Sequence, residues 1–285
     1  MSRLTIAAQD SATMLGRELK HTIRFPLMLV ASILTPVVLL LLFVYILGGP
    51  IGDGLGGNQS YVDYLVPGVL MMTVAAGTST TAINVNTDMT GGIIDRFRAM
   101  AVTRGALLTG HVAAGVLRTI VTTAVVLGVA LLVGFRPHAS AAGWVAVAGI
   151  VVAFAFALGW MSAALGLVAK TVAGANGSTL PMQFLLPFLS SVFVPAATMP
   201  VAVRWFTAHQ PFTPVVESLR ALLTGSPVGS TGYAALAWCA AIALVGYVWS
   251  RAAFRRGTRR AESAPASRGA AVAAVARRRR RDDAE

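Results

Sequence analysis

The chain has 285 residues, of which 56% are hydrophobic and only 12% are charged, against about 25% charged residues in a typical soluble domain. So few charged groups could not cover the surface of a water-soluble globular protein, and that class is excluded. The formal net charge is +12, but the basic residues gather at the chain ends and between apolar blocks, without the basic stripe and interleaved aromatic residues that a nucleic-acid binder needs.

The first 25 residues carry spaced apolar side chains among basic and polar ones, at Leu4, Ile6, Leu15, Leu19 and Ile23. This pattern predicts an amphipathic helix that lies on the inner membrane surface before the chain enters the bilayer. The apolar block that follows, residues 26–47, is longer than the apolar core of a signal peptide, about 7–15 residues. We therefore expect this block to be a permanent membrane span.

Six apolar blocks are long enough to cross a hydrocarbon core of about 30 Å at about 1.5 Å per residue. They cover residues 26–47, 61–83, 107–134, 143–169, 178–197 and 231–250. All but four of the 23 Lys and Arg residues fall on the N-terminal side of the membrane, and the basic flanks of short loops stay cytosolic. The sequence predicts an all-α polytopic protein with six transmembrane helices and both termini in the cytosol.

The second and fourth blocks are rich in small residues, which let helix backbones approach closely in lipid. They are Gly68, Ala75, Ala76 and Gly77 in the second block, and Gly159, Ala163 and Gly166 in the fourth. Such residues favour packing within the chain, and a seam between two copies is the alternative.

The inner loop between the second and third blocks, residues 84–105, mixes charged with apolar side chains. Gly91 and Gly92 can break the chain, after which IIDRFRAM can form two helical turns with both charged and apolar groups. Such a segment can dock into a groove on a partner. From the residues alone, a solvated loop beside the membrane is an equal reading.

Arg118 lies within the third block, where an ionisable residue suggests a transport path. The 18 residues from Arg118 to Phe135 correspond to about 27 Å of helix, so Arg118 is expected near the inner headgroups. There it can snorkel toward water or face the substrate path. His111 lies one heptad earlier on the same helix face and is expected in the cytosolic extension of this helix.

The fifth block contains Pro181, Pro187 and Pro195, and because proline removes a backbone donor we expect a kinked or broken span. The outer segment that follows, residues 198–225, is interrupted by further prolines. We expect it to form short re-entrant helices that dip into the outer leaflet. Glu217 and Arg220 stand three residues apart there and could form a surface ion pair.

The residues after Ser250 are dense in arginine and low in aromatic residues. This composition predicts a disordered tail that is attracted to anionic lipid. We therefore divide the chain into an interfacial helix at 1–25, a six-span transmembrane domain at 26–250, and a basic disordered cytosolic tail at 251–285.

Motifs for catalysis and metal binding are missing from the sequence. It contains no HExxH, paired-cysteine or GxSxG motif, its one cysteine is Cys239, and no GxxxxGK[ST] loop is present to cradle a nucleotide. We expect a chain that is not an enzyme, has no metal site and cannot hydrolyse ATP by itself. A membrane-embedded enzyme acting on lipids would need polar catalytic groups at matching depth, and the sequence offers none.

Two stretches carry a family resemblance: GIIDRFRAMAVTRGALLTGHV at residues 92–112, on the inner side, and HQPFTPVVESLRALLTG at residues 209–225, on the outer side. Both resemble the membrane subunits of type-2 ABC exporters, in particular the daunorubicin-resistance permease group. The resemblance covers residues 17–251, with the spans in the same order.

The resemblance implies a permease of the cytoplasmic membrane that moves a hydrophobic or amphipathic compound, such as a drug, antibiotic or lipid-like metabolite, outward. Its partners would be membrane lipid, a second permease copy, expected to form a homodimer, and a separate ABC ATPase that binds ATP and Mg²⁺, so this chain would hold no cofactor. The ATPase-coupling candidates are Asp95, Arg96, Phe97, Arg98 and Met100. The candidates for the outer re-entrant gate are Pro211, Phe212, Pro214, Glu217 and Arg220.

The alternative function is a secondary multidrug carrier driven by an ion gradient. Such a carrier would need inverted repeats or carboxylates inside the membrane, and the sequence shows neither.

Overall fold

The computed structural model describes residues 26–47, 61–91, 104–194 and 198–282. Every regular element within these ranges is helical, which confirms the all-α expectation. The elements are α2 (Pro26–Leu42), the π-helical turn η1 (Phe43–Leu47), α4 (Tyr61–Thr90), α6 (Arg104–Val133), α7 (Ala141–Val168), α8 (Val172–Leu180), the π-helical turn η2 (Pro181–Leu185), α9 (Leu186–Phe188), α10 (Val201–His209), α11 (Phe212–Thr224) and α12 (Gly229–Asp282).

Four helices in the described part of the chain are long and apolar enough to cross a membrane. They are α4, the stretch Leu107–Val133 of α6, α7, and the stretch Gly229–Arg256 of α12. The first predicted span corresponds to α2 and η1, within which Ile33–Ile46 is a shorter apolar stretch, and the fifth is broken. A polytopic membrane protein is confirmed at this level, whereas the full set of six crossings stays a prediction.

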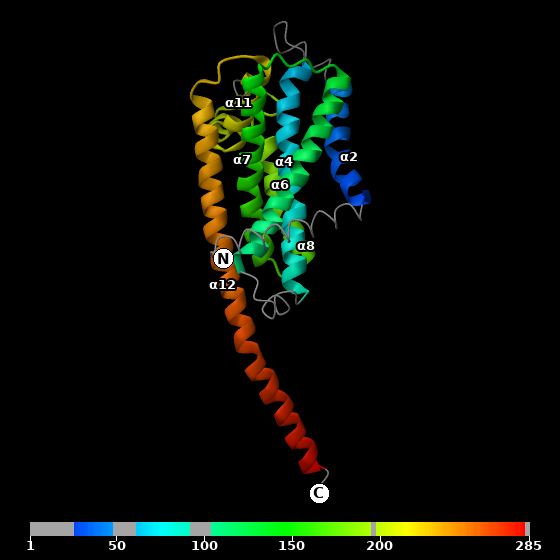
Figure 1. Cartoon of the computed structure of the whole chain (residues 1–285), viewed down its shortest axis with the longest axis vertical. Helices are drawn as coiled ribbons and strands as arrows, with labels where there is room; N and C mark the ends of the chain where they lie inside the picture. The colour runs from blue at the N-terminus through cyan, green and yellow to red at the C-terminus, as the bar shows by residue number, and fades with distance from the viewer. Residues whose placement is uncertain (1–25, 48–60, 92–103, 195–197, 283–285) are drawn as a thin grey trace, which may run out of the picture.

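The long helices stand side by side, with α4 at the centre of the bundle (Figure 1). In α4, 72% of the apolar stretch is buried inside the bundle, compared with 17% in α12. Apolar side chains on the outer faces of α6 and α12 are correspondingly exposed, as lipid-facing surfaces require. They include Val121, Val125 and Leu132 of α6, and Tyr233, Leu244 and Val248 of α12.

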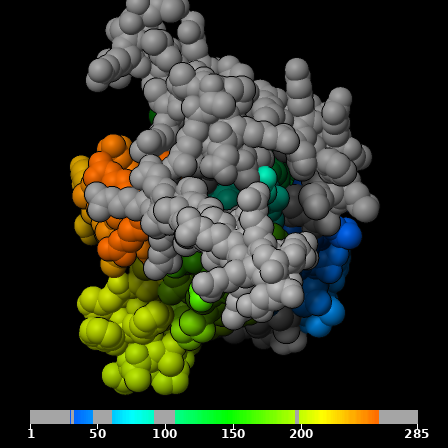
Figure 2. Space-filling model, turned by 90° about the horizontal axis from the view of Figure 1, so that it is seen from below, coloured from blue at the N-terminus to red at the C-terminus, as the bar shows by residue number. Residues whose placement is uncertain are grey.

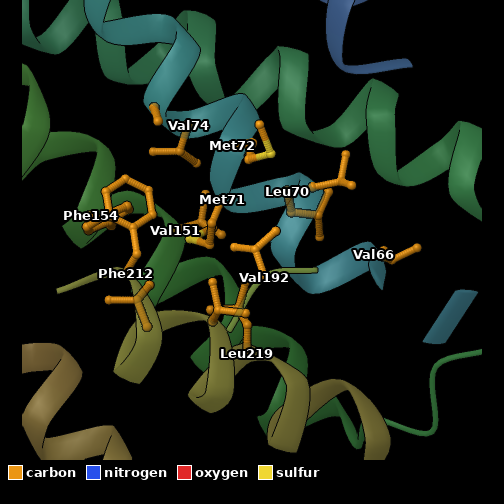
Figure 3. Packing of buried hydrophobic residues seen from close by; sticks show 14 of the residues in the cluster. Val66, Leu70, Met71, Met72, Val74, Val151, Phe154, Val192, Phe212 and Leu219 are labelled. Atoms are coloured by element: carbon orange, nitrogen blue, oxygen red, sulfur yellow. The ribbon is translucent and has the colours of Figure 1, made fainter. Parts of the chain in front are cut away.

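The core lies where α4, α7 and α11 meet (Figure 3). Leu70 and Met71 of α4 are buried against the same cluster as Phe154 of α7 and Phe212 of α11. The rings of Phe154 and Phe212 are nearly perpendicular, at 88°, with centroids 5.0 Å apart, the edge-to-face arrangement that aromatic pairs favour. A short helix, α11, is therefore packed inside the bundle.

The small residues pack against other helices of the same chain. A Cβ atom on Gly166 of α7 would lie 2.4 Å from the carbonyl oxygen of Ala82 in α4, so only glycine allows these two backbones to approach. Gly68, Gly77 and Gly159 likewise face side chains within the chain. At these glycines the structure favours intrachain packing over a seam between copies.

The fifth apolar block does not continue as one helix. It consists of α8, η2 and α9, and the helix ends at Phe188 in a turn that runs through Phe193. Pro181 begins the π-helical turn η2, and Pro187 lies one residue before the helix ends, as their missing backbone donors predict. Pro195 lies outside the described residues. Figure 2, a view along the bundle, shows yellow-green atoms, the colour of residues close to 200, projecting from one side of the molecule, well apart from α2 in blue.

The tail differs from its expected disorder, because α12 continues as a helix to Asp282, beyond the end of the bundle (Figure 1). Alanine and arginine are both strong helix formers, and they dominate residues 251–281. Low hydrophobicity predicts that this segment lacks a packed core, but it does not exclude a single helix. The division of the chain into three domains stays a prediction.

Candidate functional site

The predicted site residues fall in two separate parts of the chain, residues 95–100 and residues 211–220. Figure 1 places α11 in the half away from the C-terminus, and the ends of α4 and α6 that flank residues 92–103 at the other end. The coupling candidates Asp95, Arg96, Phe97, Arg98 and Met100, like the amphipathic segment 1–25, lie outside the described residues. The candidates for the outer gate are all described, and they lie on α11 or directly before it.

Helix α11 has clear start and stop signals. The side-chain oxygen of Gln210 accepts a hydrogen bond from the Phe212 amide at 3.1 Å, and Pro214 lies in the first turn, where a missing amide is tolerated. At the other end Gly225 adopts a left-handed conformation, φ 73°, and returns its amide to the last turn. These signals fix a helix of 13 residues.

One face of α11 is completely apolar and buried. Phe212, Val215, Val216, Leu219 and Leu223 have no exposed surface, and they pack against α4, α7 and α12. Of the predicted gate residues, Phe212 and Pro214 are buried, and Pro211, Glu217 and Arg220 are half-buried. The helix therefore presents two half-buried charged residues beside an otherwise apolar contact.

Arg220 links α11 to α4 and to the broken fifth block. Its Nη2 donates a hydrogen bond to the Ser191 carbonyl at 2.9 Å, and its Nε donates to the Tyr64 carbonyl at 3.3 Å. The guanidinium carbon lies 3.8 Å from the centroid of the Tyr64 ring, within the range of a cation–π contact. The Tyr64 hydroxyl donates to the same Ser191 carbonyl at 3.0 Å.

The helix ends after α9, so carbonyl groups in the turn that follows have no hydrogen-bond donor from a next helical turn. The contacts of Arg220 and Tyr64 supply a donor to one of these carbonyls, that of Ser191. Non-helical backbone at membrane depth is tolerated only where protein or water satisfies its polar groups. Ser191 belongs to the turn after α9, and the carbonyl of Leu189 in that turn accepts from the Thr207 hydroxyl of α10 at 2.8 Å. Helices α4, α10 and α11 therefore stabilise the break together.

The sequence singles out Arg220 but not its partners Tyr64 and Ser191. The three-residue spacing on one helix suggests Glu217 as the partner of Arg220. The guanidinium instead contacts Tyr64 and Ser191. An available signal was the position of Tyr64 in the first turn of an apolar helix, because tyrosine concentrates at membrane interfaces. Ser191 contributes only its carbonyl here, so its residue type offered no signal.

At the opposite end of the bundle, His111 of α6 lies 3.0 Å, Nε2 to Oδ2, from Asp88 of α4. Both residues are buried between helices, and the position of His111 in a cytosolic extension of the helix stays a prediction. Arg118, one heptad further along, is half-buried, and its choice between snorkelling and a substrate path stays open. Within the described residues, no group of three or more His, Cys, Asp or Glu could hold a metal ion.

Comparisons with known proteins agree on one family of transporters. The profile of the ABC-2 type transporter family matches residues 10–224. The daunorubicin resistance ABC transporter permease protein DrrB1 of Streptomyces coeruleorubidus is 31% identical over 220 residues, which cover 77% of each chain. The probable doxorubicin resistance ABC transporter permease protein DrrC of Mycobacterium tuberculosis is 26% identical over 227 residues, covering 79% of this chain and 82% of DrrC.

Proposed function

Because the chain belongs to the ABC-2 type transporter family, we propose that it is the permease subunit of an ATP-driven exporter. The match over residues 10–224, on a chain with several helices long and apolar enough to span a membrane, is the observation that carries this proposal. Membership of the family implies an ABC ATPase as partner. That ATPase would bind ATP and Mg²⁺, and this chain would supply the path through the membrane.

The proposed cargo is a hydrophobic or amphipathic compound. Its support is the naming of relatives for resistance to daunorubicin and doxorubicin, together with the apolar character of the buried bundle. In this proposal two copies of the chain face each other in the cytoplasmic membrane, each with six crossings and cytosolic termini. The excess of Lys and Arg on that side of the spans supports the orientation.

Coupling is proposed to occur at Asp95, Arg96, Phe97, Arg98 and Met100, together with the amphipathic segment 1–25. ATP-driven closure of the ATPases would move these inner elements as rigid levers. At the outer end, α10 and α11 would act as re-entrant helices that close the exit, with Pro211, Phe212, Pro214, Glu217 and Arg220 on the closing element. The burial of α11 among α4, α7 and α12 supports that role.

The decisive experiment reconstitutes the purified chain in liposomes with and without its ATPase partner. We expect outward transport of an anthracycline such as daunorubicin only with both proteins and ATP. ATP turnover by the chain alone, or transport that follows a proton gradient without ATP, would contradict the proposal. The second result would instead identify a secondary carrier.

A second experiment replaces Phe97 and Arg98 together by alanine in the reconstituted complex. Removing an apolar and a charged contact from the coupling segment should leave insertion intact while transport per ATP falls. Lys170→Ala is the control, because Lys170 is exposed at the same end of the bundle, between α7 and α8. Unchanged transport in the double variant would remove both residues from the coupling role.

A further inference from the structure

Two polar side chains near the inner end of α4 bind this helix to both of its neighbours. Asp88 pairs with His111 of α6, and the Asn86 amide donates to the Gly166 and Ala169 carbonyls at the end of α7, at 3.0 and 2.7 Å. The exposed fractions of Asn86, His111 and Asp88 are 1%, 4% and 9%. Burying a polar side chain costs free energy unless the group is paired. These three side chains are buried and make hydrogen bonds between helices, so we ask what those bonds hold in place.

The Asn86 contact completes the end of α7. The last carbonyls of a helix have no partner within the helix, and α7 ends at Val168, so the amide of Asn86 supplies the missing donor. The contact depends on the close approach of the two backbones at Gly166, where a Cβ atom would collide with the Ala82 carbonyl. Helices α4 and α7 are therefore joined by both shape and hydrogen bonds.

The Asp88–His111 pair joins α4 to α6 in apolar surroundings. Around it lies a separate buried cluster formed by Val85, Leu107, Leu108, Val112, Trp160, Ala163 and Phe254. Asp88 lies two residues before the end of α4, and His111 lies seven residues after the start of α6. The pair therefore sits directly behind both attachment points of residues 92–103.

We propose that Asp88, His111 and Asn86 are positioning residues that hold the inner ends of α4, α6 and α7 as one block, and that this block carries motion from the ATPase to the outer end. The proposal rests on the proposed function. Helix α4 has 30 residues, about 45 Å of helix, and its other end contacts Arg220 and Ser191 through Tyr64. With the three inner ends held together, a push on residues 92–103 moves α4 as part of one block and so reaches this outer contact.

The test measures the ratio of anthracycline export to ATP hydrolysed in liposomes that contain the permease and its ATPase. Asp88→Ala, His111→Ala and Asn86→Ala each remove one link, because alanine can neither donate nor accept through its side chain. We expect the ratio to fall by about fivefold or more, the usual size of a coupling effect between distant sites, while ATP turnover and complex assembly persist. The ratio in the double variant Asp88→Ala with His111→Ala should fall no further than in either single variant, because both substitutions remove the same link.

Asp63→Ala is the matched control. Asp63 lies in the first turn of α4, and its carboxylate accepts from the Arg136 amide at the outer end. The variant therefore changes the same residue type on the same helix, outside the block. Its ratio should stay within about twofold of the wild type, since surface contacts of this kind contribute little.

A rescue variant separates positioning from folding. In a Cys239→Ala background, Asp88→Cys with His111→Cys should uncouple transport, and a short bifunctional thiol reagent that rejoins α4 to α6 should restore it.

An unchanged ratio in the single variants, or a linked double variant that stays uncoupled, would overturn the proposal. Loss of ATP turnover or assembly in all three single variants would show a purely structural role and overturn it too. Absence of ATP-dependent export in the wild type would refute the proposed function instead.

Discussion

Arg220 shows how one side chain can make several kinds of contact at once. Its planar guanidinium stacks on Tyr64 and at the same time donates to two carbonyls. A lysine ammonium is a compact point charge and cannot do both. The choice of arginine therefore follows from the geometry of the break after α9, which leaves the Ser191 carbonyl facing α11 and α4.

Replacing Arg220 should destabilise the outer end in a graded way. Arg220→Met removes the charge and both donors, and we expect a loss of about 1–3 kcal/mol in the free energy of unfolding. Arg220→Lys should fall between this variant and the wild type. Thermal unfolding of the detergent-purified chain, with export measured in parallel, checks both values.

Tyr64→Phe and Glu217→Gln distinguish the observed partner from the one that spacing suggests. Loss of the Tyr64 hydroxyl should cost about 1 kcal/mol and should be non-additive with Arg220→Lys, because both contact the Ser191 carbonyl. Glu217→Gln should cost less than about 0.5 kcal/mol. A larger effect for Glu217 than for Tyr64 would mean that the ion pair governs this end.

At this scale the sequence alone does not predict the partners of Arg220, because they lie far from it along the chain. The spacing of Glu217 and Arg220 reveals neighbours on one helix, whereas the contacts of Arg220 reach back 156 residues to Tyr64 and 29 to Ser191. Hydrophobic patterns give no register between distant helices. Arg220 stands out in the sequence as a charged residue in a half-apolar segment, but the sequence does not indicate that Tyr64 and Ser191 are its partners.

At the scale of elements, the length of an apolar block predicts where a helix lies better than it predicts which helices touch. The first predicted span, residues 26–47, coincides with α2 and η1, and the blocks at 107–134 and 143–169 agree with α6 and α7 to within a few residues. The block at 61–83 stops short of Thr90, because the inner end of α4 carries polar residues that are buried against α6 and α7. A count of apolar residues cannot anticipate polar groups that are satisfied by another helix.

The crossing of α7 and α12 offers a test of helix packing. A Cβ atom on Gly246 of α12 would lie 2.6 Å from the Met161 nitrogen and 2.8 Å from the Trp160 carbonyl carbon. Both are backbone atoms, so the helices must separate to accept alanine. We expect Gly246→Ala to lower the free energy of unfolding by about 1–3 kcal/mol, measured by denaturant unfolding in detergent.

Gly149→Ala on α7 is the control for this effect, because nothing lies within 4 Å of its Cβ position. With no clash, alanine should stabilise the helix by about 0.5–1 kcal/mol through its higher helix propensity. Opposite signs for the two substitutions would support the α7–α12 crossing. The same sign for both would contradict it.

At the scale of the whole molecule, orientation decides whether the proposed function is physically possible. Helix α7 has 28 residues, about 42 Å of helix, which exceeds a hydrocarbon core of about 30 Å. A helix of this length can place its ends on opposite sides of the membrane, as the proposed function requires. The hydrogen bonds of Asn86 to Gly166 and Ala169 put the inner end of α4, and with it the attachment of residues 92–103, beside the C-terminal end of α7.

Cysteine labelling in a Cys239→Ala background tests this orientation at two exposed positions that flank α7. A membrane-impermeant thiol reagent applied to intact cells should modify His138→Cys, before α7, but should reach Ala173→Cys, in the first turn of α8, only after permeabilisation. Neither substitution alters the Lys and Arg distribution that sets the orientation. Labelling of both from outside would mean that α7 does not cross. The reversed pattern would place residues 92–103 outside, where no cytosolic ATPase could drive them, and the coupling block would lose its source of motion.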